Sequence, residues 1–239
     1  MKIAINVIAT NKYIEFVRPL CQSIERFFYP NALRTIVLHT DQDILSDLSI
    51  LCPKLRFHIN IIQHQKWPYI TLMRFHMFLQ TQHVLLDHDQ CFYIDADAIF
   101  INTIDTNLPT GMYACVHPGF KGGSGTPETN PTSTAYIPKL MAGGITYFYG
   151  GFFGGTSHDF IGLCQKLKIA VDIDGQNNIM AIWHDESHLN KYFVYYPPAF
   201  VFQYPFAVAE LFGNPTFDTV ILFLDKNARG GLDSYRLEK

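Results

Sequence analysis

The chain has 239 residues, of which 48% are hydrophobic and 16% charged, and its net charge is −3, so it is long enough to bury one full hydrophobic core. Because no Lys/Arg run exceeds two residues, the sequence lacks the basic face of a nucleic-acid-binding protein, and the hydrophobic content excludes long disordered segments.

Apolar runs bounded by polar or turn residues predict strands at residues 3–9, 35–39, 57–62, 91–94, 113–116 and 220–224. Helical spacing of apolar residues predicts helices at residues 16–28, 69–86, 160–171 and 177–193. Strand and helix alternate through the first half, which predicts an α/β fold with a mostly parallel central sheet flanked by helices. We expect the whole chain, residues 1–239, to form a single domain.

The termini and the cysteines indicate where the protein works. The first residues look like a buried strand rather than a signal peptide, and no apolar run approaches the roughly 18 residues that span a bilayer. The five cysteines are widely spaced and form no Cys-x-x-Cys pair, which favours a reducing compartment. We therefore expect a soluble, cytoplasmic protein without a membrane anchor.

Two carboxylates follow the predicted strand at residues 91–94. Asp95 and Asp97 are separated by one alanine, at the strand end where ligands bind in open α/β sheets. In an extended backbone both side chains would project to the same side and could hold one Mn²⁺ or Mg²⁺, whose other ligands a diphosphate would supply. An Asp-x-Asp phosphohydrolase, with Asp95 as nucleophile, is an alternative interpretation.

Two later segments indicate a ligand pocket. Residues 147–155 combine glycines with aromatic residues, which is typical either of a pocket floor or of a core strand with a bulge. Residues 119–138 are rich in Gly, Pro, Ser and Thr, so they form either a substrate loop or a plain surface connection.

The segment 183–193 (WHDESHLNKYF) places several ionisable side chains beside a tryptophan. Because buried carboxylates need partners, we expect this stretch to line a polar cleft. Helical geometry places Trp183 and Glu186 on one face, which suits a sugar bound against the indole with a carboxylate at its anomeric centre. A zinc site through His184 and His188 is a weaker alternative, since the zincin pattern needs Glu, not Asp185, directly after the first His.

Taken together, these motifs resemble the blood-group A/B and α-1,3-galactosyltransferase family of retaining glycosyltransferases. The segment 183–193 matches the signature of that family without a break. Further matches lie along most of the chain, at residues 8–13 (IATNKY), 67–76 (WPYITLMRFH), 94–100 (IDADAIF), 117–120 (HPGF), 133–138 (STAYIP) and 149–155 (YGGFFGG).

The resemblance implies a GT-A fold in which residues 1–100 bind the nucleotide and residues 101–239 bind the acceptor. It also implies transfer of N-acetylgalactosamine or galactose from a UDP-sugar to a galactoside or oligosaccharide, in α-1,3 linkage. Glu186 would be the catalytic residue and would also contact the acceptor, held mainly by His117 and Trp183. Asp95 and Asp97 would bind the metal. The implied donor-binding residues are Ile8, Ala9, Tyr13, Arg74, Asp95, Asp97, Tyr149, Gly150, Gly151, Asp185, Lys226 and Arg236.

The chain departs from the family pattern at several places. Animal members begin with a membrane anchor and stem, so this chain resembles a soluble prokaryotic or viral member. Tyr149 and Gly151 correspond to the donor-discriminating positions; Gly151 leaves room for an acetamido group, whereas the bulk of Tyr149 offsets that room. The usual acceptor-binding acidic residue is not clearly preserved, and Glu210 is a candidate to replace it. A catalytically inactive nucleotide-sugar-binding module is a second alternative.

Overall fold

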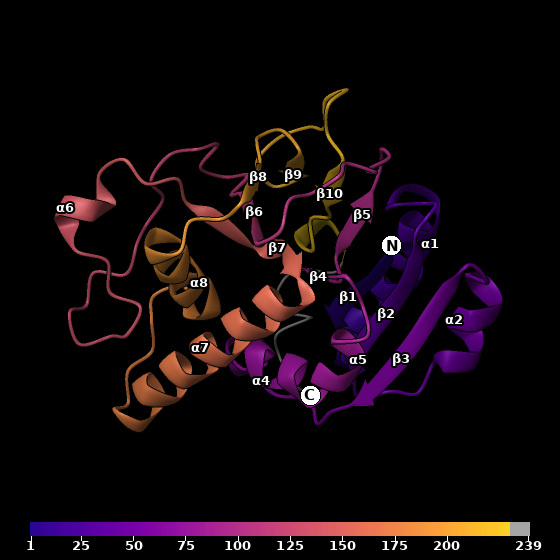
Figure 1. The fold of residues 1–239 in the computed structure, drawn as a ribbon, viewed down its shortest axis with the longest axis horizontal. Coiled ribbons are helices and arrows are strands. Elements are labelled where there is room, and N and C mark those ends of the chain that lie inside the picture. The colour runs from indigo at the N-terminus through magenta and orange to yellow at the C-terminus, as the bar shows by residue number, and fades with distance from the viewer. Residues whose placement is uncertain (230–239) are drawn as a thin grey trace.

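A seven-stranded sheet runs through the middle of the molecule (Figure 1). The computed structural model describes residues 1–229. In spatial order the strands are β3 (Leu55–Ile61), β2 (Leu33–Thr40), β1 (Lys2–Ile8), β4 (Gln90–Ile94), β7 (Phe148–Thr156), β6 (Met112–Val116) and β8 (Phe200–Phe202). The first four are parallel, β7 is antiparallel to both of its neighbours, and β8 is parallel to β6. The predicted α/β fold with a mostly parallel sheet is confirmed.

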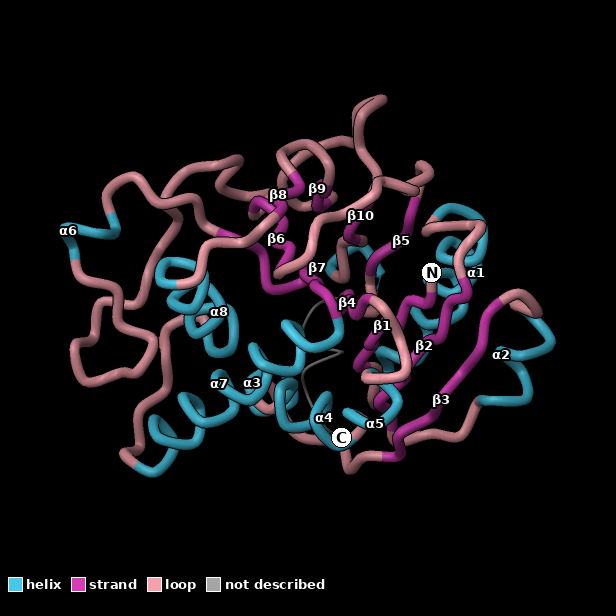
Figure 2. The backbone as a smooth tube through the Cα atoms, in the orientation of Figure 1, coloured by secondary structure: helices cyan, strands magenta, loops and turns pink. Residues whose placement is uncertain are grey.

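Helices cover both faces of this sheet (Figure 2). On one face lie η1 (Asn11–Phe16), α1 (Val17–Phe27) and α2 (Leu45–Leu51), packed in one apolar core with a second, three-stranded sheet of order β5 (Ala98–Phe100), β10 (Ile221–Phe223) and β9 (Ala207–Ala209). The other core is covered by α3 (Tyr69–Leu72), α4 (Arg74–Gln80), α5 (Gln82–Leu85), α7 (Ser157–Gln176) and α8 (His184–Tyr195). The short elements α6 (Lys139–Ala142) and η2 (Asn227–Arg229) complete the described chain.

The predicted strands all coincide with strands, and residues 148–156 form β7, one of the two alternatives for the glycine-aromatic stretch. Two helix predictions are wrong in extent. The single helix expected at residues 69–86 is three short helices, because Met73 and Thr81 adopt non-helical backbone angles. The helix expected from residue 177 begins at His184, whose φ of 50° lies in the left-handed region.

The order of the strands brings distant segments to one edge of the sheet. Strands β1 and β4 are parallel neighbours, so the residues after both strands meet at their carboxyl ends. Strand β7 is antiparallel to β4 and therefore begins at this edge, where the Asp95 amide donates a hydrogen bond of 2.9 Å to the Gly151 carbonyl oxygen. The segments at residues 8–13, 94–100 and 149–155, which all carry family motifs, therefore lie together at this edge.

Candidate active site

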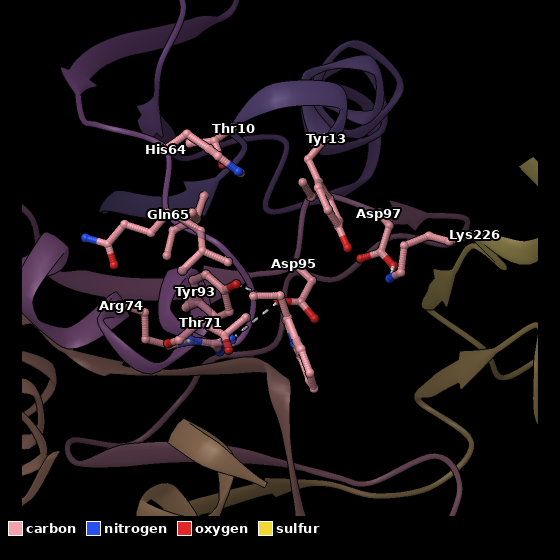
Figure 3. A pocket seen from close by; sticks show the side chains of 14 residues that line it. Thr10, Tyr13, His64, Gln65, Thr71, Arg74, Tyr93, Asp95, Asp97 and Lys226 are labelled. Atoms are coloured by element: carbon pink, nitrogen blue, oxygen red, sulfur yellow. Dashed lines mark hydrogen bonds and ion pairs between the residues drawn. The ribbon is translucent and has the colours of Figure 1, made fainter. Parts of the chain in front are cut away.

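A cavity of about 190 Å³ opens at this edge of the sheet (Figure 3). Its walls come from the ends of β1 and β4, from the segment before α3, from α3 and α4, and from the chain after β10. The lining residues are Ile8, Thr10, Tyr13, His64, Gln65, Trp67, Ile70, Thr71, Arg74, Tyr93, Asp95, Ala96, Asp97 and Lys226. The cavity therefore has an aromatic and amide-rich part beside a cluster of charges.

The aromatic part lies over the end of β1. Tyr13 and Trp67 both line it, and the Thr10 hydroxyl is 2.9 Å from Nδ1 of His64. Of the implied donor-binding residues near β1, Ile8 and Tyr13 lie in the wall, whereas Ala9 is fully buried in the core beneath. Rings and hydrogen-bonding side chains of this kind can hold a planar heterocycle.

Asp95 and Asp97 lie in a turn directly after β4. The expectation of an extended backbone is wrong, because the Ala98 amide donates back to the Asp95 carbonyl oxygen over 3.2 Å. Both aspartates nevertheless line the cavity, and the Tyr93 hydroxyl donates a 2.5 Å hydrogen bond to Oδ1 of Asp95. Burial is the main cause that raises the pKa of Asp97, and the neighbouring Asp95 carboxylate adds to it.

Arg74 connects the cavity to helix α8. Its side chain is buried, with Nη1 donating to the Gly150 carbonyl oxygen over 2.6 Å and Nε lying 3.1 Å from Oδ2 of Asp185. The guanidinium also lies over the Tyr93 ring, 4.4 Å from its centroid, and 4.0 Å from Oδ1 of Asp95. A fixed positive charge is thereby held between the acidic turn and the carboxylates of α8.

Glu186 lies behind this wall, in the first turn of α8. The backbone of Gly150 joins it to Arg74, because the Gly150 N–H donates to Oε2 of Glu186 over 2.7 Å while the Gly150 carbonyl oxygen accepts from Arg74. Burial raises the pKa of Glu186 to about 8, and the Asp185 carboxylate adds to this effect. Burial also raises the pKa of Asp185 to about 6, although the positive charge of Arg74 acts in the opposite direction. The structure therefore brings Glu186, Asp185 and Arg74 together, although neither carboxylate lines the cavity itself.

His117 faces Glu186 from the far side. Its Nε2 is 4.0 Å from Oε1 of Glu186, and its Nδ1 accepts a hydrogen bond of 3.0 Å from the Gly119 amide. Burial lowers the pKa of His117 to about 4, so the ring is neutral at pH 7 and its single proton is on Nε2, facing the carboxylate. A hydroxyl group that bridges the two side chains from one side would meet one donor and one acceptor.

Trp183 lies outside helix α8 rather than on the face of Glu186 as expected. Its backbone caps the helix, with the amide donating to the Ser187 hydroxyl, and its ring nitrogen hydrogen-bonds the Thr126 hydroxyl. The indole is 45% exposed. This contact ties the 119–138 segment to the start of α8, beside an aromatic surface that remains open to a ligand.

Tyr149 fills the space above Gly151. A Cβ atom on Gly151 would come within 2.4 Å of the Tyr149 ring and 2.7 Å of Oδ2 of Asp95. The ring packs edge-on against His117 and Phe223, with centroid distances of 5.0 and 4.8 Å. The absence of a side chain at Gly151 therefore accommodates Tyr149, and the room expected there for an acetamido group is occupied by this ring.

The acidic turn fits a hard divalent cation. Two carboxylates on one wall supply oxygen ligands of the type that Mn²⁺ and Mg²⁺ prefer. One of them already contacts a cation, since the Lys226 ammonium forms an ion pair with Oδ2 of Asp97. Residues 1–229 contain no group of three or more His, Cys, Asp or Glu side chains arranged to hold a metal. A metal on Asp95 and Asp97 would thus need further ligands from a bound substrate.

The histidines of the zinc alternative have different partners. The His184 ring packs edge-on against Trp67 at 4.9 Å between centroids. His188 is buried, with Nε2 3.7 Å from Oδ2 of Asp174 and Nδ1 3.4 Å from the Thr134 hydroxyl. His188 therefore belongs to the contacts that hold the 119–138 segment on α7, where Asp174 also accepts from the Ser133 hydroxyl.

Several residues of the site escaped the sequence analysis. Thr10, His64 and Gln65 line the cavity, and Tyr93 orients Asp95. Tyr93 had a detectable signal, since it lies on β4 two residues before Asp95, whereas His64 and Gln65 follow β3 in a segment without any motif. Glu210 pairs with Arg229 at 2.7 Å rather than facing the cavity. Arg236 lies outside the described residues.

Comparison with known proteins identifies similar sequences. The family model of glycosyltransferase family 6 matches residues 1–217. The O-antigen biosynthesis glycosyltransferase WbnI of Escherichia coli is 28% identical over 233 residues, which cover 95% of each chain. The histo-blood group ABO system transferase 1 of Rattus norvegicus is 28% identical over 202 residues, or 82% of this chain. The globoside alpha-1,3-N-acetylgalactosaminyltransferase 1 of Gallus gallus is 29% identical over 210 residues, or 83% of this chain.

The vertebrate relatives are longer proteins. The matched region spans 58% of the rat transferase and 59% of the chicken enzyme. Within residues 1–229, no helix combines the length and the apolar character that crossing a membrane requires.

Proposed function

The chain belongs to glycosyltransferase family 6, and from that premise we propose that it moves N-acetylgalactosamine or galactose from a UDP-sugar to a galactoside, in α-1,3 linkage and with retention of anomeric configuration. The observation that carries the proposal is the position of the buried Arg74, whose guanidinium lies 4.0 Å from Asp95 of the acidic turn and is joined to the carboxyl group of Glu186 through the backbone of Gly150. The names of the rat and chicken relatives, a blood-group transferase and an N-acetylgalactosaminyltransferase, support the sugar class.

Two sets of cavity residues would bind the two parts of the donor, the uracil and the diphosphate. Ile8, Tyr13 and Trp67 would hold the uracil, while Asp95 and Asp97 would hold Mn²⁺ or Mg²⁺ on the diphosphate. The bound metal would neutralise phosphate charge and stabilise the leaving diphosphate.

Arg74 and Asp185 would orient the donor sugar. Arg74 is fixed by the Gly150 carbonyl oxygen and by Asp185, so its charge is preorganised and costs little rearrangement during transfer. The Asp185 oxygen that Arg74 does not contact can accept from a sugar hydroxyl group.

Glu186 would face the anomeric carbon, either as a nucleophile or as the charge that stabilises an oxocarbenium-like transition state. In both cases the ionised form acts. The Gly150 amide fixes one carboxylate oxygen, and the proton on Nε2 of His117 points toward the other. An acceptor hydroxyl that bridges His117 and Glu186 from one side would thereby be presented to the same carbon.

Assays of UDP release test the proposal against its alternatives. The protein is incubated with UDP-N-acetylgalactosamine, UDP-galactose or UDP-glucose, with Mn²⁺ or with chelator, and with a panel of galactosides. We expect UDP release that depends on Mn²⁺ and on a galactoside, with an α-linked product by NMR. Hydrolysis of simple phosphate esters would favour the phosphohydrolase, and donor binding without UDP release under any condition would favour the inactive binding module.

A further inference from the structure

Lys226 neutralises the second aspartate of the acidic turn. Asp97 is only 3% exposed, and Nζ of Lys226 forms an ion pair with its Oδ2. The lysine comes from the chain after β10 and reaches Asp97 at the cavity wall, beside the ring of Tyr13 (Figure 3). Burying a carboxylate without a partner costs free energy, so the ammonium group of Lys226 stabilises Asp97 in its buried position.

The segment that carries Lys226 is held at two places. The Leu224 amide donates to the Asp97 carbonyl oxygen over 2.8 Å, which fixes the end of β10 against the acidic turn. Glu210 then accepts from the Asp225 amide over 2.7 Å and from Nη1 of Arg229 over 2.7 Å. Nη1 of Arg229 also donates to the Asp225 carbonyl oxygen over 2.9 Å, so Lys226 lies inside a clasp formed by Glu210 and Arg229.

We infer that Lys226 is the resident counter-ion of Asp97 in the donor-free protein, and that a divalent cation binds to this aspartate only by displacing the ammonium group. The inference rests on the metal site of the proposed function. Oδ2 of Asp97 already contacts one cation, and a second cation on the same buried carboxylate would be repelled at short range in a medium of low dielectric constant.

Displacement of the ammonium also couples the metal to the diphosphate. Once displaced, Lys226 needs a new anion, and the cavity that it lines is the place where the diphosphate would supply one. Metal without nucleotide therefore leaves Lys226 without a partner, whereas metal with UDP does not. The two ligands should bind with positive coupling, to which Lys226 contributes beyond the direct coordination of the metal by the diphosphate.

Mn²⁺ binding to the full chain tests the inference without any turnover. Free Mn²⁺ is measured by electron paramagnetic resonance during titration, with and without UDP, for the wild type, Lys226→Met and Lys226→Arg. We expect Lys226→Met to bind Mn²⁺ more tightly without UDP, by about tenfold or more, because one close charge pair no longer opposes the metal. Lys226→Arg keeps the charge and should stay close to the wild type, as should Lys54→Met, whose lysine is exposed and outside the cavity.

The outcomes separate this inference from the metal site itself. Unchanged or weaker Mn²⁺ binding by Lys226→Met, with the wild type still binding Mn²⁺ in the presence of UDP, would overturn the counter-ion role and leave the metal site standing. Failure of every variant to bind Mn²⁺, with or without UDP, would overturn the metal site and the inference together.

Glu210→Gln provides a second variant that leaves both Lys226 and Asp97 in place. Loss of the charge that holds Arg229 should loosen the clasp and tighten Mn²⁺ binding without UDP by about two- to threefold, since a partly exposed ion pair contributes little. If Lys226→Met does not fold, an unchanged Mn²⁺ affinity in folded Glu210→Gln would overturn the inference.

Discussion

The carboxyl group of Glu186 has surroundings that oppose its charge. Burial raises its pKa to about 8, with the Gly150 amide acting in the opposite direction. Because the pKa is raised on folding, the contribution of this group to stability is fully present below its unfolded pKa, near 4.5, and is lost as the pH rises through about 8. The protein thus gives up stability at neutral pH to keep a carboxyl group at the position where the proposed chemistry needs its ionised form.

Glu186→Gln should lower turnover. The amide keeps the volume and the hydrogen bond from Gly150 but cannot carry the negative charge, so turnover should fall by about 10²- to 10⁴-fold while donor affinity changes little. In the wild type, kcat/KM should fall about tenfold for each pH unit below about 8, since protonated Glu186 is inactive. Initial-rate kinetics from pH 5.5 to 9, with donor binding by calorimetry, measure both effects.

Glu15→Gln is the matched control, because Glu15 is exposed on η1 and lines no part of the cavity. Its pH profile and turnover should match the wild type. Turnover of Glu186→Gln close to that of the wild type would remove Glu186 from catalysis.

The sequence could predict the chemistry-bearing residues better than their geometry. Asp95, Asp97 and Glu186 stand out because carboxylates are rare in a chain with 16% charged residues, and Arg74 was located only through the family resemblance. Nothing in the sequence indicated that Lys226 pairs with Asp97, or that Tyr149 covers Gly151. Both contacts depend on the path of the chain between segments far apart in sequence, which local patterns do not encode.

Among the elements, α8 and β7 are joined by the side chain of Asn190. Its Oδ1 accepts from the Phe148 amide over 2.7 Å, and its Nδ2 donates to the carbonyl oxygens of Phe148 and Glu186, both over 2.9 Å. One buried amide therefore completes the start of β7 and holds the helical turn that carries Glu186.

Asn190→Ala should accordingly affect both stability and catalysis. It leaves the amide and carbonyl groups of Phe148 buried without partners, so the free energy of unfolding should fall by about 2–4 kcal/mol. Turnover should also fall, because Glu186 is no longer fixed relative to Gly150. Urea unfolding and initial rates measure these effects, and Asn31→Ala, at an exposed turn, is the control. A stability equal to that of the control would show that Asn190 does not hold α8 on β7.

Sequence patterns predicted the strands of the large sheet better than the ends of the helices. Apolar runs located five of the seven strands of the large sheet, because buried strands must be apolar, and the predicted bounds lie within two residues of the observed ones. No apolar run predicted β8. The interruption after α3 could not be predicted, since residues 69–86 keep a helical pattern. The break at Met73 allows Nε of Arg74 to donate to the Thr71 carbonyl oxygen over 3.2 Å while its Nη1 reaches Gly150, so tertiary contacts outweigh the local preference for one helix.

Across the whole molecule, the large sheet joins the two halves of the chain that the sequence analysis distinguished. Strands β1 to β4 come from residues 1–100 and β6 to β8 from the remainder, and the two groups meet where β4 pairs with β7. The smaller sheet repeats this arrangement, because β5 pairs with β10. Neither sheet can be divided near residue 100 without breaking strand pairs, and the single domain stays a prediction.

Thermal unfolding of the full chain should therefore show one cooperative transition, and UDP with Mn²⁺ should raise its midpoint as a unit. The cavity is lined by residues from β1 through Lys226, so a ligand there binds only the folded arrangement of both halves. At a concentration one hundred times its Kd, a ligand stabilises by about 2.7 kcal/mol, which shifts Tm by about 5–10 °C for a protein of this size. Calorimetry with UDP and Mn²⁺, UDP and chelator, or CMP as a control measures the shift. Two separate transitions, with the ligand moving only one of them, would show that the halves unfold independently and that the donor binds to one of them alone.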